Sequence, residues 1–319
     1  MPEVESEVLP NLAPLPREGL ARLWRRLQPL RRGCTNPATD GGIAAARHQP
    51  LAFDHLRLAT PVREAIHRAQ AATSPGLVFS RGRLGVIIPV RNREHHLAEL
   101  LPTLCRTLDE AAIEYEIHVI EQTHGLPFNK GQLFNAGIRE ALERCDYIAL
   151  HDVDFLPVKV CYARPNRPLR PFGICLNNYG TRPLPNPCFG GVVIAPGRDL
   201  LRINGLSNRY WHWGKEDDDL LLRCLLAGVV PYADHSGLFR ELEHSPSRVQ
   251  TPEGKPPGSI MEKRALRRLY QRNRSRFRLM ARGLLEPSAD GLSDLPCRIL
   301  GRQHESTFTR MVLEPGGQP

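Results

Sequence analysis

Two carboxylates separated by a single residue, Asp152 and Asp154, directly follow the apolar run YIALH. Carboxylates at positions i and i+2 after a strand offer the hard oxygen ligands that Mg²⁺ and Mn²⁺ prefer. A cation held there would bridge the diphosphate of a nucleotide sugar and neutralise the leaving group as the glycosidic bond breaks. Such a pair occurs by chance in many proteins, so its position at the end of a strand is what favours a metal site.

A second group, WHWGKEDDD over residues 211–219, sets four consecutive carboxylates beside two tryptophans. Like charges this close repel, which raises the pKa of one carboxyl and favours a general base near neutral pH. Tryptophan faces stack on the apolar face of a pyranose, and carboxylates accept hydrogen bonds from its hydroxyls. The stretch therefore predicts a sugar site. The alternative is an acidic helix N-terminus that the helix macrodipole stabilises.

A third candidate is His244, which lies in the segment RELEHSPSR. A histidine can supply a metal ligand through a ring nitrogen. A lone histidine, however, is more often a core or surface residue than a ligand, so His244 gains weight only from its neighbours in the fold.

The elements that position these residues begin at Leu84. Strands are predicted over residues 84–90 (LGVIIPV), 115–122 and 147–157, with helices over 96–108 and 129–145 between them. This alternation is typical of an α/β domain with a parallel sheet, in which ligands bind at the carboxyl ends of the strands. We therefore expect Arg91, Gln122 and Asp152 to Asp154 to share one rim.

Residues 1–80 are frequently interrupted by Gly and Pro, so we expect an N-terminal helical and irregular region followed by a domain over residues 81–319. Helices are predicted over residues 18–32 and 61–72. In the first, Leu20, Trp24 and Leu27 fall on one face among several arginines. That amphipathic helix either docks on the domain or makes a peripheral contact with a membrane.

Composition indicates an ordinary globular protein, with 41% hydrophobic and 24% charged residues. No apolar run approaches the roughly 20 residues that span a bilayer. The N-terminus carries acids and prolines where a signal peptide has basic and then apolar residues. The 8 cysteines form no C-x-x-C pair, so we expect reduced thiols rather than a zinc knuckle or a disulfide scaffold. A soluble, cytoplasmic protein is expected.

The net charge of +9 is concentrated in residues 263–282, which hold nine basic residues and no acid. This run is interpreted either as a solvated helix face or as a contact for a nucleotide diphosphate, an anionic acceptor or an anionic membrane. Nucleic acid is not an expected partner, because Tyr270 and Phe277 are the only aromatic residues of the run and no nucleic-acid-binding motif accompanies it.

Taken in chain order, these residues resemble the β-1,4-galactosyltransferase family (glycosyltransferase family 7). The resemblance runs from about residue 84 to residue 315 and rests on IIPVRNREHHL, PFNKGQLFNAGIREAL, YIALHDVDFLP, CFGGVVIAPGRDLLRINGLSNRYWHWGKEDDDL, EHSPSR and SADGLSDLPCRIL. It implies an α/β, GT-A-type nucleotide-sugar-binding fold with a mainly parallel central sheet flanked by helices. It also implies inverting transfer of galactose from UDP-galactose to an acceptor hydroxyl of a carbohydrate or glycolipid, with Mn²⁺ or Mg²⁺. The product expected from the resemblance is a β-glycoside with a β-1,4 linkage.

Site residues follow from the same resemblance. Asp217 would be the catalytic base with Glu216 beside it, and Asp154, His244 and Glu241 would hold the metal. The substrate-binding residues would be Pro89, Arg91, Arg93, Phe128, Lys130, Asp152, Cys188, Gly190, Gly191, Trp213, Gly214 and Asp218.

Four departures from the family pattern matter. Lys130 stands where the family usually has arginine, and Glu241 stands where it has methionine or histidine. Cys188 replaces a bulky tyrosine, which leaves room for a 2-acetamido group and makes UDP-N-acetylgalactosamine an alternative donor in polysaccharide synthesis. The membrane anchor of the Golgi members is missing, which favours a soluble, bacterial-type member. A catalytically inactive, sugar-binding relative is the remaining alternative.

Overall fold

The computed structural model describes residues 48–71, 76–177, 180–183, 189–243 and 258–319 of the chain. Within these residues no helix has both the length and the apolar character needed to cross a membrane. The expected helix over residues 18–32, the candidate ligand His244 and the candidate specificity residue Cys188 lie outside the described residues.

The strand β3 (Leu84–Val90) lies at the centre of the fold, and all of its residues are buried. Its successive side chains enter two different cores. Val86 and Ile88 pack in the hydrophobic cluster that includes residues of α4 (Glu94–Glu110), whereas Ile87 packs in the cluster that includes residues of α5 (Lys130–Ala141). A strand covered on both faces needs apolar residues at every position, which explains the unbroken run LGVIIPV.

The main sheet has nine strands and is mixed. In spatial order the strands are β1 (His48–Pro50), β12 (Tyr232–Asp234), β8 (Leu169–Arg170), β11 (Val192–Pro196), β5 (Tyr147–His151), β3, β4 (Tyr115–Gln122), β15 (Thr309–Glu314) and β14 (Arg298–His304). The central strands β5, β3, β4 and β15 are parallel, as expected, but β11 and β14 pair antiparallel at either side. The sheet is thus parallel at its centre and mixed as a whole, rather than mainly parallel.

The strand predicted over residues 147–157 is wrong in its length, because it breaks at Asp152–Asp154. β5 ends at His151, and β6 (Phe155–Lys159) joins a separate sheet in the order β10 (Gly180–Pro183), β9 (Ile174–Asn177), β13 (Leu238–Glu241) and β6. A two-stranded ribbon pairs β2 (Phe79–Ser80) with β7 (Arg164–Pro165). The break leaves both aspartates at the junction of the two sheets.

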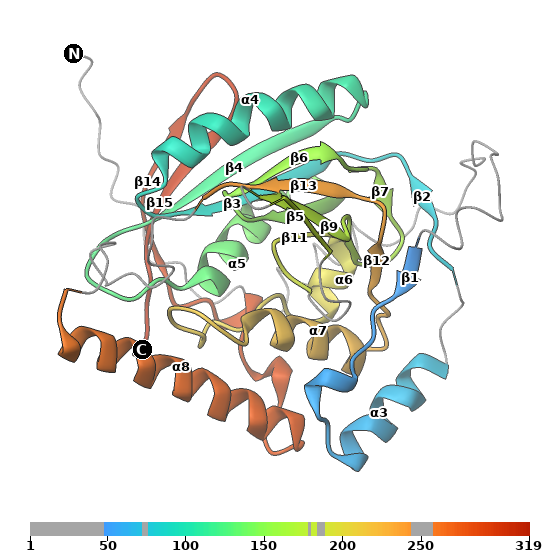
Figure 1. Cartoon of the computed structure of the whole chain (residues 1–319), viewed down its shortest axis with the longest axis vertical. Coiled ribbons are helices and arrows are strands. Elements are labelled where there is room, and N and C mark those ends of the chain that lie inside the picture. The colour runs from blue at the N-terminus through green and yellow to red at the C-terminus, as the bar shows by residue number, and fades with distance from the viewer. Residues whose placement is uncertain (1–47, 72–75, 178–179, 184–188, 244–257) are drawn as a thin grey trace.

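Helices cover both faces of the main sheet (Figure 1), with α4 on one side and α5, α6 (Gly197–Arg202) and α7 (Glu216–Leu226) on the other. The long helix α8 (Ile260–Ala281) lies along the outside of α7. Three short 3₁₀ turns complete the described chain, at η1 (Asp54–Leu56), η2 (Pro287–Ala289) and η3 (Leu292–Asp294).

The chain joins the core from its first described residues. β1 pairs with β12, and α3 (Thr60–Ala71) packs on α7 with Val62 and Ile66 buried. Residues 48–71 share a sheet and a core with the rest of the described chain. A separate N-terminal region, expected over residues 1–80, therefore stays a prediction for residues 1–47.

Candidate active site

The carboxyl ends of three parallel strands meet at one edge of the main sheet. β3 ends at Val90, β4 at Gln122 and β5 at His151, so the expected rim of Arg91, Gln122 and Asp152 is present. The backbone N–H of Asp152 donates to the carbonyl of Gly191, at 2.8 Å. This bond ties the first aspartate of the pair to the glycines that precede β11.

Lys130, the first residue of α5, connects two of the candidate carboxylates. Its Nζ lies 2.9 Å from Oδ2 of Asp152 and 3.6 Å from Oδ1 of Asp217. Asn129 caps α5, accepting from the N–H of Gln132, and its own N–H donates to Gln122 Oε1 at 2.7 Å. The end of β4 and the start of α5 therefore fix the position of Lys130.

The loop before α7 presents the acidic run through unusual backbone. His212 and Lys215 have left-handed φ angles of 68° and 77°, and Gly214 has 104°. Left-handed conformations of side-chain-bearing residues cost about 1–3 kcal/mol and cluster at functional sites. The surroundings hold the loop, because His212 N–H donates to Phe128 carbonyl at 2.7 Å and Asn273 Nδ2 donates to the carbonyls of Trp211 and Trp213.

The four carboxylates of the run have different partners. Glu216 accepts from the N–H of Gly214 at 2.9 Å, and Asp217 faces Lys130. Asp218 instead pairs with Lys215 and with His55 of η1. Asp219 is fully buried, with Oδ2 at 2.7 Å from Nε of Arg223.

The pKa values of the first two carboxyls lie above their ordinary range. Burial, together with the charge of Asp217, raises the pKa of Glu216 to about 7. Burial also raises the pKa of Asp217, assisted by Asp152 and Asp218 and opposed by the ammonium of Lys130. Because the two carboxyls interact, they titrate as a pair. The pair can exchange a proton near neutral pH, as a general base requires.

For Asp218 the balance is opposite. Burial acts to raise its pKa, but the hydrogen bonds from His55 and Lys215 outweigh burial and the net pKa is lowered. Asp218 is therefore ionised at neutral pH.

Gly190 and Gly191 bring bare main chain against the catalytic candidates. A Cβ on Gly190 would lie 2.1 Å from Oδ2 of Asp217, so any side chain there would displace the carboxylate. Gly191 has a φ of 77°, and a Cβ there would meet the rings of Phe172 and Phe155 at 3.1 and 3.2 Å. Gly190 thus makes room for the carboxylate of Asp217, and Gly191 makes room for the rings of Phe172 and Phe155.

The candidate nucleotide-binding residues lie at the ends of β3 and β4. Pro89 is buried within β3. Arg91 is buried too; it donates to the carbonyl of Leu126 at 2.8 Å, and its guanidinium lies 5.3 Å from the ring centre of Phe128. Burial lowers the pKa of Arg93, against the attraction of Asp154. Arg91 and Phe128 therefore form one contact surface, with Arg93 near the second aspartate.

The two tryptophans have different environments. Trp211 is 4% exposed and belongs to the core, whereas Trp213 is 58% exposed. Trp213 stacks on Tyr270 of α8, with ring centres 5.5 Å apart and planes inclined by 18°. Sequence reasoning missed Tyr270, although its spacing from Leu266, Asn273 and Phe277 matches the buried face of a helix.

The second sheet places the backbone segments of the metal candidates Asp154 and Glu241 side by side. Glu241 of β13 pairs with Phe155, the residue after Asp154, and the N–H of Leu242 donates to the carbonyl of Asp154 at 2.7 Å. Two carboxylates are a donor set suited to Mn²⁺ or Mg²⁺. Among the described residues no group of three His, Cys, Asp or Glu side chains forms a metal cluster. The fit of these two positions to a hard cation therefore rests on their oxygen donors.

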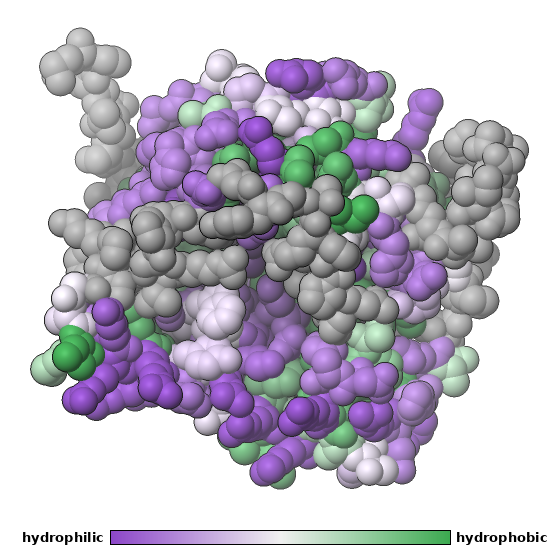
Figure 2. Space-filling model, viewed as in Figure 1, coloured by the Kyte–Doolittle hydropathy of each residue, from purple (hydrophilic) through white to green (hydrophobic). Residues whose placement is uncertain are grey.

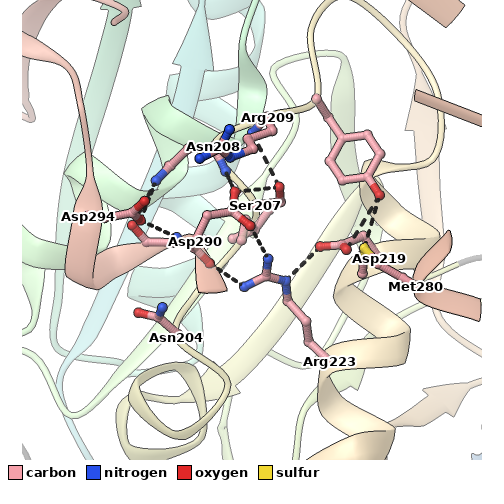
Figure 3. A network of polar contacts seen from close by, with 12 residues as sticks. Asn204, Ser207, Asn208, Arg209, Asp219, Arg223, Met280, Asp290 and Asp294 are labelled. Atoms are coloured by element: carbon pink, nitrogen blue, oxygen red, sulfur yellow. Dashed lines mark hydrogen bonds and ion pairs between the residues drawn. The ribbon is translucent and has the colours of Figure 1, made fainter. Parts of the chain in front are cut away.

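A buried polar network adjoins the acidic run, because Asp219 belongs to both (Figure 3). Arg223 lies between Asp219 and Asp290, and Arg276 of α8 also pairs with Asp290, at 2.9 Å. The second oxygen of Asp290 accepts from the Ser207 hydroxyl at 2.7 Å and from the Asn208 N–H. The network fastens α7, α8 and the segment before Trp211 to one another. Its signal in the sequence was the i, i+4 spacing of Asp219 and Arg223.

Comparison with protein families gives two adjoining matches. A model of the N-terminal region of glycosyl transferase group 7 matches residues 36–162, and a model of the N-terminal domain of galactosyltransferase matches residues 170–245. The chain belongs to glycosyltransferase family 7. The resemblance seen in its motifs is thereby confirmed.

Individual relatives of this family 7 chain include human β-1,4-galactosyltransferase 3, which is 34% identical over 251 residues. That alignment covers 75% of this chain and 57% of the relative. Human β-1,4-galactosyltransferase 1 is 29% identical over 252 residues, with 76% and 57% covered. The family 7 chain thus spans a little over half of the length of these relatives.

Solved structures confirm the fold. The catalytic domain of Drosophila β-1,4-galactosyltransferase 7 with xylobiose superposes with a TM-score of 0.56, 22% identity and coverage of 74% of this chain and 95% of that chain. A variant of the Drosophila enzyme in complex with manganese, UDP-Gal and xylobiose gives 0.57, with the same identity and coverage. This family 7 chain accordingly has the GT-A fold predicted from its motifs.

Proposed function

We propose that this protein transfers galactose from UDP-galactose to a hydroxyl of an acceptor sugar, with inversion, to give a β-glycoside. The linkage we propose is β-1,4, the one in the names of its relatives. The observation that carries the proposal is the position of Asp217. Its carboxylate lies against the bare backbone of Gly190, faces Lys130 and is 38% exposed. An accessible carboxylate with a raised pKa is suited to accept a proton from a substrate.

The reaction is a single displacement. The acceptor oxygen forms a bond to the anomeric carbon from the face opposite to UDP, and the bond from that carbon to the diphosphate oxygen breaks with its electron pair. Asp217 takes the proton of the acceptor hydroxyl. Glu216, which accepts from the N–H of Gly214, is the neighbouring carboxyl, and burial together with the charge of Asp217 raises its own pKa to about 7. No covalent bond to the enzyme is needed.

Binding of the donor falls to the rim of the sheet. We assign the nucleotide to Pro89, Arg91, Arg93 and Phe128, because Arg91 and Phe128 already form one contact surface there. Lys130 and Asp152 would lie beside the sugar diphosphate, and Gly191 would border it. Trp213 and Gly214, with Asp218 near them, would contact the sugars, since an exposed indole face suits a pyranose.

Asp154 and Glu241, with His244, are the residues we assign to a Mn²⁺ ion, with Mg²⁺ as the alternative. Their carboxylate oxygens fit a hard divalent cation, and β13 holds Glu241 beside the Asp154 segment. When bound, such an ion supplies positive charge that stabilises the diphosphate leaving group. Glu241→Ala tests the assignment directly: unchanged Mn²⁺ affinity in a titration without substrate would remove Glu241 from the ligand set.

The donor has one specific alternative. Cys188 is smaller than the tyrosine of galactose-specific members, which favours UDP-N-acetylgalactosamine as a second candidate.

The six described cysteines are free thiols, and four of them are buried. Reduced thiols support the proposal that the enzyme is cytoplasmic. Cell fractionation tests this, and recovery of the protein from an oxidising compartment would contradict it.

The testing experiment measures UDP release from a panel of UDP-sugars with mixed acceptors, with Mn²⁺ or with EDTA. Wild type is compared with Asp217→Asn and with the exposed-carboxylate control Asp54→Asn. Loss of a general base lowers kcat by about 10²–10⁴-fold. We expect Mn²⁺-dependent release from UDP-galactose that is lost in Asp217→Asn and kept in the control. Preference for UDP-N-acetylgalactosamine would reassign the donor, and no release from any donor would favour an inactive, sugar-binding relative.

A further inference from the structure

The outer face of α8 carries a concentration of positive charge that the proposed reaction does not use. The exposed residues Arg264, Arg267, Arg268 and Arg278 follow one another at spacings that share one side of a helix. The opposite side, with Leu266, Asn273 and Phe277, is buried. α8 is therefore fixed in orientation, with its basic side outward.

Within the described part of the chain these four arginines have no acidic partner, although their neighbour Arg272 donates to an oxygen of the terminal residue Pro319. No carboxylate there lies within ion-pair distance of Arg264, Arg267, Arg268 or Arg278. The single acid of the helix, Glu262, is used at its start, where it accepts from the N–H groups of Gly258 and Ser259 in a capping box. Like charges three or four residues apart destabilise a helix by about 0.2–0.5 kcal/mol per pair, so the arrangement is unfavourable without an external anion.

Apolar side chains flank the arginines on the same side. Ile260 and Met261, at the start of α8, are 70% and 78% exposed, and Leu279 and Leu284, at its end, are 41% and 66% exposed. Figure 2 displays hydrophilic side chains along α8, with a hydrophobic group at the end where the helix begins. A 22-residue helix is about 33 Å long, so this face can contact several lipid headgroups at once.

We propose that the outer face of α8 binds the surface of a membrane rich in anionic lipids. The arginines would contact lipid phosphates. Arg264, Arg267, Arg268 and Arg272 line a shallow depression of about 530 Å³ together with Gln271 and Ser275, and Arg278 lies outside it. The apolar residues at the two ends would enter the boundary between headgroups and acyl chains. A soluble polyanion would use the arginines alone, so the exposed apolar residues are what favour a bilayer. The inference goes beyond the proposed function and does not depend on it.

The test uses the full chain in flotation assays with vesicles of phosphatidylcholine alone or with one quarter phosphatidylglycerol. The variant Arg264→Gln/Arg267→Gln/Arg268→Gln/Arg278→Gln removes four charges and keeps good helix formers. The matched control removes four exposed arginines elsewhere, and consists of Arg68→Gln, Arg81→Gln, Arg106→Gln and Arg202→Gln.

We expect wild type and control to bind the anionic vesicles and not the neutral ones. Each basic residue near an anionic surface contributes about 1 kcal/mol, or roughly fivefold, so the α8 variant should bind several hundred-fold more weakly. Equal losses in the two variants, or none in the α8 variant, would overturn the proposal.

A second variant distinguishes a bilayer from other polyanions. Ile260→Ser/Met261→Ser keeps the charge and should lower vesicle binding at least about tenfold, because it removes apolar burial. Its binding to heparin, a soluble polyanion, should equal that of wild type. If vesicle binding were equally unaffected, α8 would be a general polyanion-binding face and the membrane proposal would be wrong. Circular dichroism of every variant checks that the fold is retained.

Discussion

The two halves of the acidic run at the start of α7 have the same residue types and opposite roles. Glu216 and Asp217 lie toward the edge of the main sheet, where burial raises both pKa values. The charge of Asp217 adds to the effect on Glu216, and the charges of Asp152 and Asp218 add to the effect on Asp217. Asp218 and Asp219 instead form ion pairs, Asp218 with Lys215 and Asp219 with Arg223. The four adjacent carboxylates thus divide into two with raised pKa values, Glu216 and Asp217, and two in ion pairs that hold the helix in place.

The difference teaches that side-chain chemistry is set by what faces each turn of a helix. A rotation of about 100° per residue carries successive side chains from the sheet edge to the protein interior. The alternative of a structural helix N-terminus therefore fits Asp218 and Asp219, whereas the sugar site stays a proposal for Glu216 and Asp217.

The largest effect is expected from breaking the structural half. Asp219→Ala leaves Arg223 with one carboxylate fewer in a buried network, and loss of one partner from such a network costs about 3–5 kcal/mol of unfolding free energy. Asp217→Ala, by contrast, should leave stability unchanged or raise it. Urea denaturation of both variants measures the contrast, and equal stabilities would refute the division of the run.

The next largest effect is expected from Gly190, the glycine that adjoins the proposed catalytic residue Asp217. Gly190→Ala places a methyl group where Oδ2 of Asp217 now lies, so the carboxylate must move. Misplacement of a reacting group by about 1 Å costs on the order of 100-fold in rate. We expect that loss in kcat with little change in stability. Gly301→Ala, where a methyl group meets nothing within 4 Å, is the matched control and should keep full activity.

The pH dependence of stability sharpens the comparison further. The pKa of Glu216 in the folded chain, about 7, exceeds the ordinary value of 4.5, so the folded state keeps a proton that the unfolded chain has lost between those pH values. Stability from this group is therefore present at low pH and is lost as pH rises through 7. Glu216→Gln removes the titration. Relative to wild type it should gain about 2–3 kcal/mol between pH 5 and pH 8, and parallel stability curves would contradict this.

The smallest effect is expected at Asp218. Its pairs with Lys215 and His55 are partly exposed, and pairs of that kind contribute about 0.2–1 kcal/mol. Because its pKa is lowered, this contribution is present above the ordinary pKa of an aspartate and is lost as pH falls. A double-mutant cycle of Asp218→Asn with Lys215→Met, measured at pH 7, gives the coupling energy. A value above about 2 kcal/mol would show that Asp218 belongs with the strongly coupled residues.

Sequence patterns predicted the central part of the fold well. The strands at 84–90 and 115–122 and the rim of their carboxyl ends are present, because buried parallel strands leave continuous apolar runs. The second sheet was missed, since β6 follows the two aspartates without any turn signal in its composition. The antiparallel pairing of β11 and β14 beside the parallel centre was also missed, because the pattern within one segment does not show which strand it pairs with or in which direction.

The site was predicted by residue type rather than by arrangement. Motif resemblance named Asp152 and Asp217 as candidates, but the bridge that Lys130 makes between them joins three separate segments and has no local signature. The contact of Tyr270 with Trp213 is likewise long-range. Only the Asp219–Arg223 pair had a readable signal, its helical spacing.

The order of strands in the main sheet has a consequence for how the chain folds. β11, from the second family-matched segment, lies between β8 and β5, and β4 pairs with β15 about 190 residues further along. Neither matched segment can complete its own sheet while it emerges from the ribosome. Contacts this distant in sequence make folding slow, so the sheet must close after synthesis of residues 309–314. The two matched segments are units of sequence comparison, and the folding unit is the whole sheet.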